Sequence, residues 1–462
     1  MIARKDPSRR RSSWPSPPRI TWLIRLIASS AAPALALATV AALAGVAGCS
    51  SATATEPRDA IVLEGPPPFE VRRRTSWPTA GWPEATPEEV GLDPAAIGRL
   101  EAYLFARNGD DADRRGQRTN GFVLIKDGKL VYERYARGYD ADTPTLTWSV
   151  SKSIANTIVG RAVAEGFLDL NDAIGEHYPP AKDGGVDDVR VSDLLRMSSG
   201  VDWNETYETS PVFSSVMAML YTRGRGDMAA FVASHGLAHP PGTRWSYSSG
   251  DTNLLMGVLR AALGDERNAD YPWVALFDRI GMSSAVLERD AAGTFIGSSY
   301  VYATPRDLAK WGFLMLNDGV WEGERLLPAG WVKFSLTMAP AYFNTELTPG
   351  TVDDNPGAQV YLNHGDPARD VPPPWPAAPR DTFAAQGHWG KSIFVFPSLD
   401  MIAVRTGDDR VYACDIPGNA KCEPDSTKAY SKIHLLELIM ATVPGGVEGA
   451  GTTAKADPKE GG

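Results

Sequence analysis

The strongest constraint on the fold is a pair of hairpin patterns that lie far apart in the sequence. Residues 121–135 form two runs of alternating apolar residues joined at Asp127-Gly128, a dipeptide typical of a tight β-turn. Strand character returns at 391–396 and 401–405, with a short turn between them. If the two hairpins share one sheet, everything between them must be inserted into that sheet.

The inserted region has helical start and stop signals instead. The sequence predicts helices over 146–166, 192–197, 227–234 and 251–263, and a further helix from Thr304-Pro305 to Gly319. It also predicts a first helix from 86 to about 104, a long loop over 340–380 and a closing helix over 426–442. We therefore expect an α+β fold, in which an antiparallel sheet is flanked by helices and carries an inserted, mostly helical domain.

These patterns divide the chain into four parts. We expect a signal peptide over 1–48, a flexible tether over 49–85, a folded domain over 86–442 and a disordered tail over 443–462. Within the folded domain, the α/β part comprises 86–145 and 380–442, and the helical part comprises 146–379.

The N-terminus has the architecture of an export signal. Its first 25 residues hold seven basic side chains against one acid, and 26–48 are apolar and uncharged. An uncleaved anchor helix is the competing interpretation. The end of the run, Val46-Ala47-Gly48-Cys49, resembles the bacterial lipoprotein cleavage box, which implies a lipid on Cys49. We expect an exported protein anchored in the bacterial cell envelope, on the periplasmic side of the outer membrane.

Charge and cysteine content limit the possible partners. Removal of 1–48 takes the formal charge from -10 to -16, which argues against nucleic-acid binding. Cys414 and Cys422 flank a predicted turn, and they can form a disulfide or remain two free thiols. His235 and His239 are separated by helix-breaking residues, so we expect no metal site.

The helix predicted over 146–166 begins with a pair of residues suited to nucleophilic chemistry. Ser149 and Lys152 are three apart in its first turn, so their side chains share one face. A serine hydroxyl needs a base to attack an acyl carbon, and a buried lysine amine can be that base. The alternative is structural, with Ser149 as an N-cap and Lys152 in solvent.

Two later segments carry further candidate side chains. Tyr247 precedes a predicted helix and could relay a proton, or it could simply pack at the helix entrance; Ser249 follows it. Residues 385–392 form a Gly-rich approach to a strand, where a backbone N–H can complete an oxyanion hole with that of Ser149. The alternative for this segment is a turn into a buried strand.

Ser149-x-x-Lys152, Tyr247-x-Ser249 and His388-Trp389-Gly390, in this order, resemble the three motifs of the serine β-lactamase and penicillin-binding-protein superfamily. Within it, the chain is similar to the class C β-lactamase-related group of carboxylesterases, D-aminopeptidases and 6-aminohexanoate-dimer hydrolases. The resemblance implies that Ser149 is the nucleophile, Lys152 its base partner and Tyr247 a proton relay. It also implies an oxyanion hole of the Ser149 and Lys391 amides, and no cofactor.

Two departures from those motifs bear on the substrate. Ser249 stands where β-lactamases usually have Asn, and His388 stands where they usually have Lys. With Trp389 and Gly390, these residues are the predicted substrate-binding set, and they favour a small ester, a linear amide or a peptide. The alternatives are a β-lactamase or D-amino-acid peptidase, and a catalytically inactive binding lipoprotein of the cell envelope.

Overall fold

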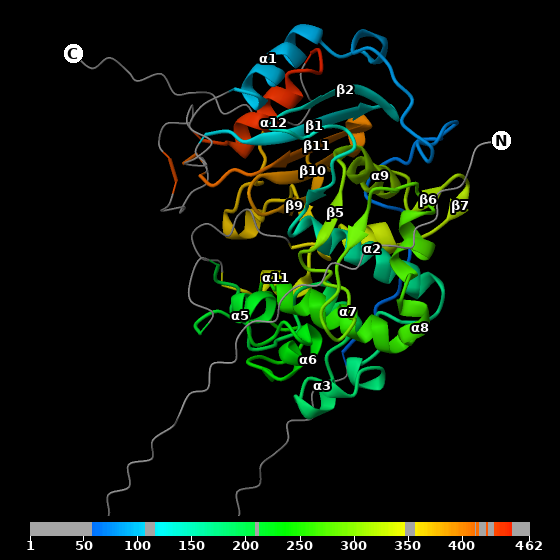
Figure 1. Ribbon diagram of the computed structural model, residues 1–462, viewed down its shortest axis with the longest axis vertical. Helices are drawn as coiled ribbons and strands as arrows, with labels where there is room; N and C mark the ends of the chain where they lie inside the picture. The colour runs from blue at the N-terminus through cyan, green and yellow to red at the C-terminus, as the bar shows by residue number, and fades with distance from the viewer. Residues whose placement is uncertain are drawn as a thin grey trace, which may run out of the picture. The chain divides into compact units, whose positions relative to one another are not determined.

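A six-stranded antiparallel sheet organises the computed structural model, which describes residues 58–106, 116–207, 212–346, 356–411, 413–414, 422–423 and 429–445. The strand order is β2-β1-β11-β10-β9-β8, and Figure 1 labels the first five of these strands. The strands are β1 Thr119–Lys126, β2 Lys129–Tyr135, β8 Tyr361–Leu362, β9 Phe383–Gly387, β10 Lys391–Phe396 and β11 Met401–Gly407. The two predicted hairpins therefore do share one sheet.

Both hairpins form as their turn residues require. Asp127 and Gly128 have φ values of 53° and 74°, the left-handed conformation that a two-residue hairpin turn needs. Lys126 pairs with Lys129 across this turn, and Phe396 pairs with Met401 in the second hairpin. The sheet continues because β1 also pairs with β11 along its length.

Helices cover both faces of the sheet. In β1, Phe122 and Leu124 join one buried apolar cluster with α1 (Pro94–Leu104) and α12 (Lys432–Met440), which pack together in Figure 1. Val123 and Ile125 face the other side, towards α2 (Val150–Ala164) and α9 (Pro305–Leu316). Because both faces are buried, these strands contain near-continuous apolar runs.

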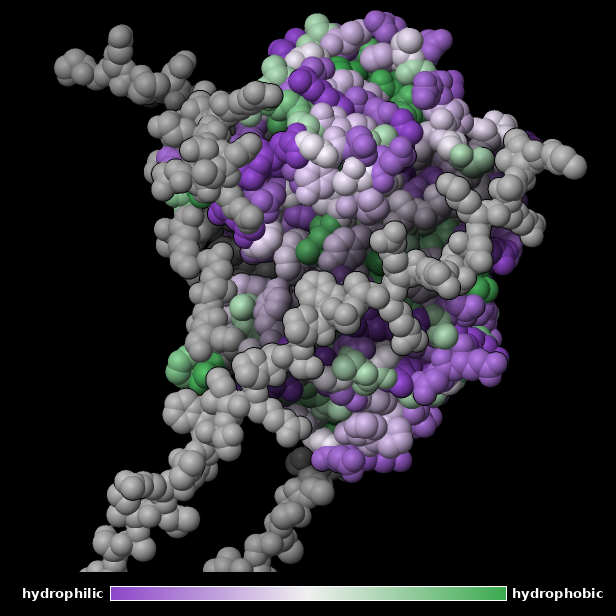
Figure 2. Space-filling model, viewed as in Figure 1, coloured by the Kyte–Doolittle hydropathy of each residue, from purple (hydrophilic) through white to green (hydrophobic). Residues whose placement is uncertain are grey.

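The inserted region is mainly helical. Its other helices are α3 Pro180–Asp183, α4 Val191–Leu195, α5 Ser215–Tyr221, α6 Met228–Ala233, α7 Ser249–Leu263, α8 Asp265–Asn268, α10 Trp331–Ser335 and α11 Pro340–Phe343. Two small sheets, β3-β5-β4 and β6-β7, comprise β3 Thr145–Leu146, β4 Val286–Leu287, β5 Val301–Ala303, β6 Val320–Trp321 and β7 Glu324–Arg325. Figure 2 shows polar side chains over most of the described surface on one face, with apolar residues in small separate groups.

Helix α2 lies at the centre of this arrangement. Every residue from Val150 to Ala162 is buried, because α2 packs against β9 and β10 on one side and against α7 on another. Its N-terminus is consequently held between the sheet and the helical region. The helices α2 and α9 belong to the predicted helical part, yet α9 packs directly on β1, β10 and β11.

The prediction of a free tether over 49–85 is wrong for residues 59–85, a segment that we call the strap. Arg74 forms a bidentate ion pair with Asp400, with both N–O distances at 2.6 Å. Trp77 packs against Phe313 and Trp321, and Ile61 N donates to Asn171 Oδ1 at 2.7 Å. An extended segment buries side chains without any helical or strand period, so the sequence pattern did not reveal it.

Some predicted helix boundaries also need correction. The first helix does not run from 86, because Gly91 adopts φ 73° and Asp93 caps a new start at Pro94. The closing helix begins at Lys432, after its Ser431 cap, rather than at 426. The predicted loop over 340–380 contains α11, β8 and a short 3-10 turn in its described residues.

Other predictions from the sequence fall outside the described residues. The signal peptide, Cys49 and nearly all of the C-terminal tail are among them. Within the ranges that the structure describes, no helix combines the length and apolar character needed to cross a membrane.

Candidate active site

The candidate active site begins at the N-terminus of α2. Trp148 has φ 50°, a conformation that non-glycine residues adopt at a cost, and it turns the chain so that Ser149 precedes the first helical residue. Ser149 makes no side-chain cap hydrogen bond, and Lys152 is only 1% exposed. Lys152 Nζ lies 3.1 Å from Ser149 Oγ. The structural alternative of a capping serine and a solvated lysine is therefore wrong.

Three oxygen atoms surround the Lys152 amine. Besides Ser149 Oγ, it contacts Ser249 Oγ at 2.9 Å and the Ser298 carbonyl oxygen at 3.0 Å. Ser249 lies in the first turn of α7, which starts two residues earlier than predicted because Ser248 is its N-cap. Side chains of the first and second motifs are thus brought together at one amine.

Tyr247 lies beside the same amine. Lys152 Nζ lies over the face of the Tyr247 ring, 4.9 Å from its centre. The ring also packs against the cluster of Met197, Trp245 and Tyr342. This contact is made by the ring face, so the proton-relay role of the Tyr247 phenol stays a prediction.

The third motif approaches Ser149 through Gly387, the last residue of β9. A Cβ at position 387 would overlap the Thr147 carbonyl oxygen and lie 3.3 Å from Ser149 N. Only glycine allows the strand to approach the nucleophile this closely. The segment 385–392 therefore includes the end of strand β9 as well as the turn that follows it. From the sequence, β9 was not predicted as a strand.

The turn after β9 is held from behind by a buried ion pair. Arg405 Nη1 donates to the Gly390 carbonyl oxygen at 2.7 Å and to Asp409 Oδ2 at 2.5 Å. Asp409 N in turn donates to the Trp389 carbonyl oxygen at 3.3 Å. Both side chains of the pair are at most 1% exposed. Sequence reasoning did not find this pair, although a charged residue inside the apolar 401–405 pattern was a signal for it.

Aromatic rings line the approach to the site. Trp148 lies 5.4 Å from Trp389 and 6.3 Å from His388, measured between ring centres. The His388 ring stacks on Tyr207 at 5.7 Å. The Arg410 guanidinium lies 3.2 Å from the centre of the Trp389 ring. Of the predicted substrate-binding residues, His388 and Trp389 are thus placed in one aromatic wall beside the nucleophile.

The Lys391 amine lies beside the third motif, 3.4 Å from the His388 carbonyl oxygen and 5.9 Å from the centre of the Trp389 ring. Its Nζ donates to the Gly407 carbonyl oxygen at 2.5 Å, and the residue is 5% exposed. Burial lowers the pKa of Lys391 to about 8, against the opposing effect of Asp408 and Asp409. Its backbone pairs with that of Gly387 in the sheet. The role of its amide in an oxyanion hole stays a prediction.

Glu205 and Tyr207 are site residues that the sequence did not reveal. Glu205 Oε1 accepts hydrogen bonds from Ser249 Oγ at 2.5 Å and from the Tyr207 hydroxyl at 2.6 Å. Burial, followed by the charge of Glu205, raises the pKa of Tyr207 well above its usual value. The segment that carries both residues has no regular period, so no pattern marked it.

A second buried carboxyl lies two residues after Ser249. Asp251 Oδ1 accepts from Ser199 Oγ at 2.8 Å and from Ser248 Oγ at 2.9 Å, beside a cavity of about 180 Å³. Burial raises the pKa of Asp251 to about 7, and the two serine hydroxyls only partly offset this effect. Its protonation therefore changes close to neutrality.

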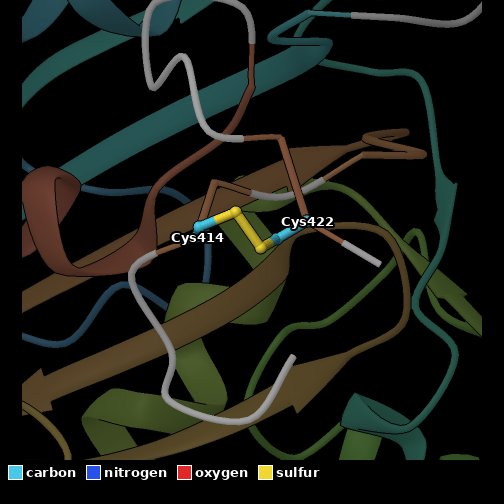
Figure 3. Close-up of a disulfide and its surroundings, with 2 residues drawn as sticks. All are labelled: Cys414 and Cys422. Atoms are coloured by element: carbon cyan, nitrogen blue, oxygen red, sulfur yellow. A yellow bond between two sulfur atoms is a disulfide. The ribbon is translucent and has the colours of Figure 1, made fainter. Parts of the chain in front are cut away.

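Cys414 and Cys422 are joined by a disulfide with a Cα–Cα distance of 4.8 Å (Figure 3). The structure thus selects the disulfide over the two free thiols. Among the described residues, no cluster of three or more His, Cys, Asp or Glu side chains could hold a metal ion.

The fold and the Ser–Lys pair define a class of protein, the β-lactamase and penicillin-binding-protein type of serine hydrolase. The chain belongs to the Beta-lactamase family, whose sequence profile matches residues 105–407. A penicillin-binding-protein homologue from Caulobacter crescentus has a similar fold, with a TM-score of 0.52 and 18% identity over 76% of this chain and 99% of that one. A family VIII carboxylesterase also has a TM-score of 0.52, with 16% identity over 75% of this chain and 97% of that one.

Curated relatives are similar over shorter stretches. The 6-aminohexanoate-dimer hydrolase of Paenarthrobacter ureafaciens is 30% identical over 256 residues, which are 52% of this chain and 64% of that protein. A Salmonella paratyphi A protein provisionally named D-alanyl-D-alanine carboxypeptidase is 24% identical over 38% of this chain and 44% of its own length. The chain therefore spans less than two thirds of the length of these relatives.

Proposed function

We propose that the protein hydrolyses esters or linear amides through an acyl-enzyme on Ser149. The observation that carries this proposal is the 3.1 Å contact between Lys152 Nζ and Ser149 Oγ at the start of a buried helix. A hydroxyl and an amine at hydrogen-bond distance are the parts that nucleophilic catalysis requires. The partial positive charge of the helix N-terminus favours the negative charge that develops there.

In acylation, the Ser149 oxygen bonds to the acyl carbon while its proton moves to the lone pair of the neutral Lys152 amine. The bond from that carbon to the leaving oxygen or nitrogen then breaks, and the leaving group takes up the proton, with Tyr247 as the relay. Water repeats these steps on the acyl-enzyme, releasing the acid and restoring the Ser149 hydroxyl. The amides of Ser149 and Lys391 are the proposed oxyanion donors.

The aromatic wall supports an apolar acyl or leaving group. Trp148, Trp389 and Tyr207 place aromatic rings near the nucleophile, whereas the Lys391 amine donates to the Gly407 carbonyl oxygen. A β-lactam needs a cation for its carboxylate, and His388 stands where β-lactamases usually have a lysine. The names of the hydrolase and carboxylesterase relatives agree with linear amides and esters.

An acylating or phosphonylating probe tests the proposal directly. We expect covalent labelling of Ser149, located by peptide mapping, and loss of labelling in Ser149→Ala. Turnover of nitrophenyl esters should fall in that variant by about a thousandfold or more. A folded protein that neither labels nor turns over esters, amides, D-peptides or a cephalosporin would favour the inactive binding lipoprotein.

We also propose that the mature protein is anchored to the bacterial cell envelope through lipid on Cys49. The basic and apolar leader that ends at Gly48-Cys49 supports this location. Intact-mass analysis of membrane-extracted protein tests it. An N-terminus elsewhere, or an unmodified Cys49, rejects it.

A further inference from the structure

Glu205 is enclosed by hydrogen-bond donors. Its Oε1 accepts from Ser249 Oγ at 2.5 Å and from Tyr207 OH at 2.6 Å. Its Oε2 accepts from Trp203 Nε1 at 2.6 Å and from Ser249 N at 2.9 Å. Because both oxygens act only as acceptors, this arrangement suits the ionised carboxylate.

The carboxylate fixes the direction of the hydrogen bond made by Ser249. A serine hydroxyl has one hydrogen, and here Glu205 receives it. Ser249 Oγ can therefore only accept from Lys152 Nζ, 2.9 Å away. Glu205 thus acts on the amine through an intervening hydroxyl.

This direction determines where the lone pair of Lys152 lies. A neutral amine has two hydrogens and one lone pair. In the neutral amine that acylation requires, Ser249 Oγ and the Ser298 carbonyl oxygen accept the two hydrogens. The lone pair is then left for the Ser149 hydroxyl, whose oxygen lies 3.1 Å from Nζ. If Ser249 could donate instead, its hydrogen would compete with that of Ser149 for the same lone pair.

We propose that Glu205 is a positioning residue, which keeps Ser249 an acceptor and so reserves the Lys152 lone pair for Ser149. The proposal rests on the function proposed above, and it explains how a serine can stand where related enzymes usually have an asparagine. The asparagine carbonyl is an acceptor by nature, whereas a serine hydroxyl becomes one only when its hydrogen is held elsewhere.

A double-mutant cycle between Glu205 and Ser249 tests the proposal. Glu205→Gln keeps the shape of the side chain, but its NH₂ group faces the hydrogen-bond donors that surround the carboxylate. Ser249→Ala removes the hydroxyl through which Glu205 acts. We expect E205Q and S249A each to lower kcat on a nitrophenyl ester by about 10- to 100-fold, with KM changed by less than about threefold. The double variant should be no slower than the slower single variant, within about threefold.

A merely structural role predicts other results. If Glu205 only braces its loop, E205Q lowers the melting temperature and leaves kcat of the folded enzyme near wild type. If it acts independently of Ser249, the two losses multiply. Either result overturns the proposal. Should E205Q fail to fold, Glu205→Asp, which withdraws the carboxylate from Ser249, takes its place under the same criteria.

Glu165→Gln is the matched control. Glu165 also accepts a hydrogen bond from a tyrosine hydroxyl, that of Tyr271 at 2.9 Å, but it lies at the other end of α2. We expect E165Q to change stability without changing kcat. Labelling of wild-type Ser149 is measured in parallel, because its absence would reject the proposed function, whereas a labelled and active E205Q would reject only the positioning role.

Discussion

Gly387 lies against the backbone of Ser149 so closely that any side chain at position 387 would meet it. A Cβ there would be 3.3 Å from Ser149 N and would overlap the Thr147 carbonyl oxygen. The end of β9 and the start of α2 are thus in backbone contact. The position of the third motif relative to the nucleophile depends on this contact.

Gly387→Ala should therefore lower kcat/KM strongly, while the melting temperature changes comparatively little. The added methyl group must push β9 away from Ser149, and a displacement of about 1 Å can lower turnover by about a hundredfold. We would compare kcat/KM and melting temperature with those of Gly98→Ala, since a Cβ at Gly98 has no atom within 4 Å. Equal activity in the two variants would contradict the proposed importance of this contact.

Lys152→Ala should be nearly as inactive as Ser149→Ala, with a loss of about a thousandfold, because the hydroxyl loses its base. Turnover of a nitrophenyl ester by folded Lys152→Ala and folded Ser149→Ala, compared with wild type, checks this expectation. A folded Lys152→Ala variant that kept wild-type turnover would remove Lys152 from the role of base.

Asp409→Asn should destabilise the protein by about 3–5 kcal/mol, because it leaves the buried Arg405 charge without its partner. It should also lower kcat, since the Arg405–Asp409 pair holds the turn at Gly390. Asp265→Asn is the control, because Asp265 is 79% exposed in its pair with Arg260. Chemical denaturation should show a much smaller change in the free energy of unfolding for that exposed pair.

Asp251 should make the free energy of unfolding depend on pH. Its pKa is about 7 in the folded protein and near 3.8 when unfolded, so the folded state binds the proton more tightly. The resulting stabilisation is complete below pH 3.8 and is lost as the pH rises through 7, by at most a few kcal/mol. Asp251→Asn should lack this decline. The free energy of unfolding should be measured at pH 5 and pH 8 for both proteins. The same change between the two pH values in wild type and variant would contradict the assignment of this pH dependence to Asp251.

The protein should prefer esters to β-lactams. An unpaired carboxylate in a partly desolvated cleft costs a few kcal/mol, so we expect kcat/KM for a short nitrophenyl ester to exceed that for a chromogenic cephalosporin by about a hundredfold. His388→Lys, which supplies a fixed cation, should reduce the difference in kcat/KM between the ester and the cephalosporin. Wild-type values that are equal, or higher for the cephalosporin, would support the β-lactamase alternative.

The sequence predicted the elements whose signals are local. The Asp127-Gly128 turn and the Thr304 cap depend on neighbouring residues, and both form as expected. Glu205 could not be predicted, because its role depends on Ser249, which is 44 residues away. The same reason applies to the strap, since Arg74 meets Asp400 only in the folded chain. Local sequence periodicity predicts helices and strands, whereas the candidate site also depends on contacts between segments that are far apart in the sequence.

Because the strap is docked on the folded domain, it also shortens the linker that would connect a lipid on Cys49 to that domain. Ile61 is already fixed to Asn171, so only the eleven residues between positions 49 and 61 could extend. A fully extended chain covers at most about 3.6 Å per residue, which gives a reach of roughly 40 Å. The catalytic body would then stay close to the membrane surface, and it would meet lipid-borne or envelope-bound esters and amides before those in the surrounding fluid.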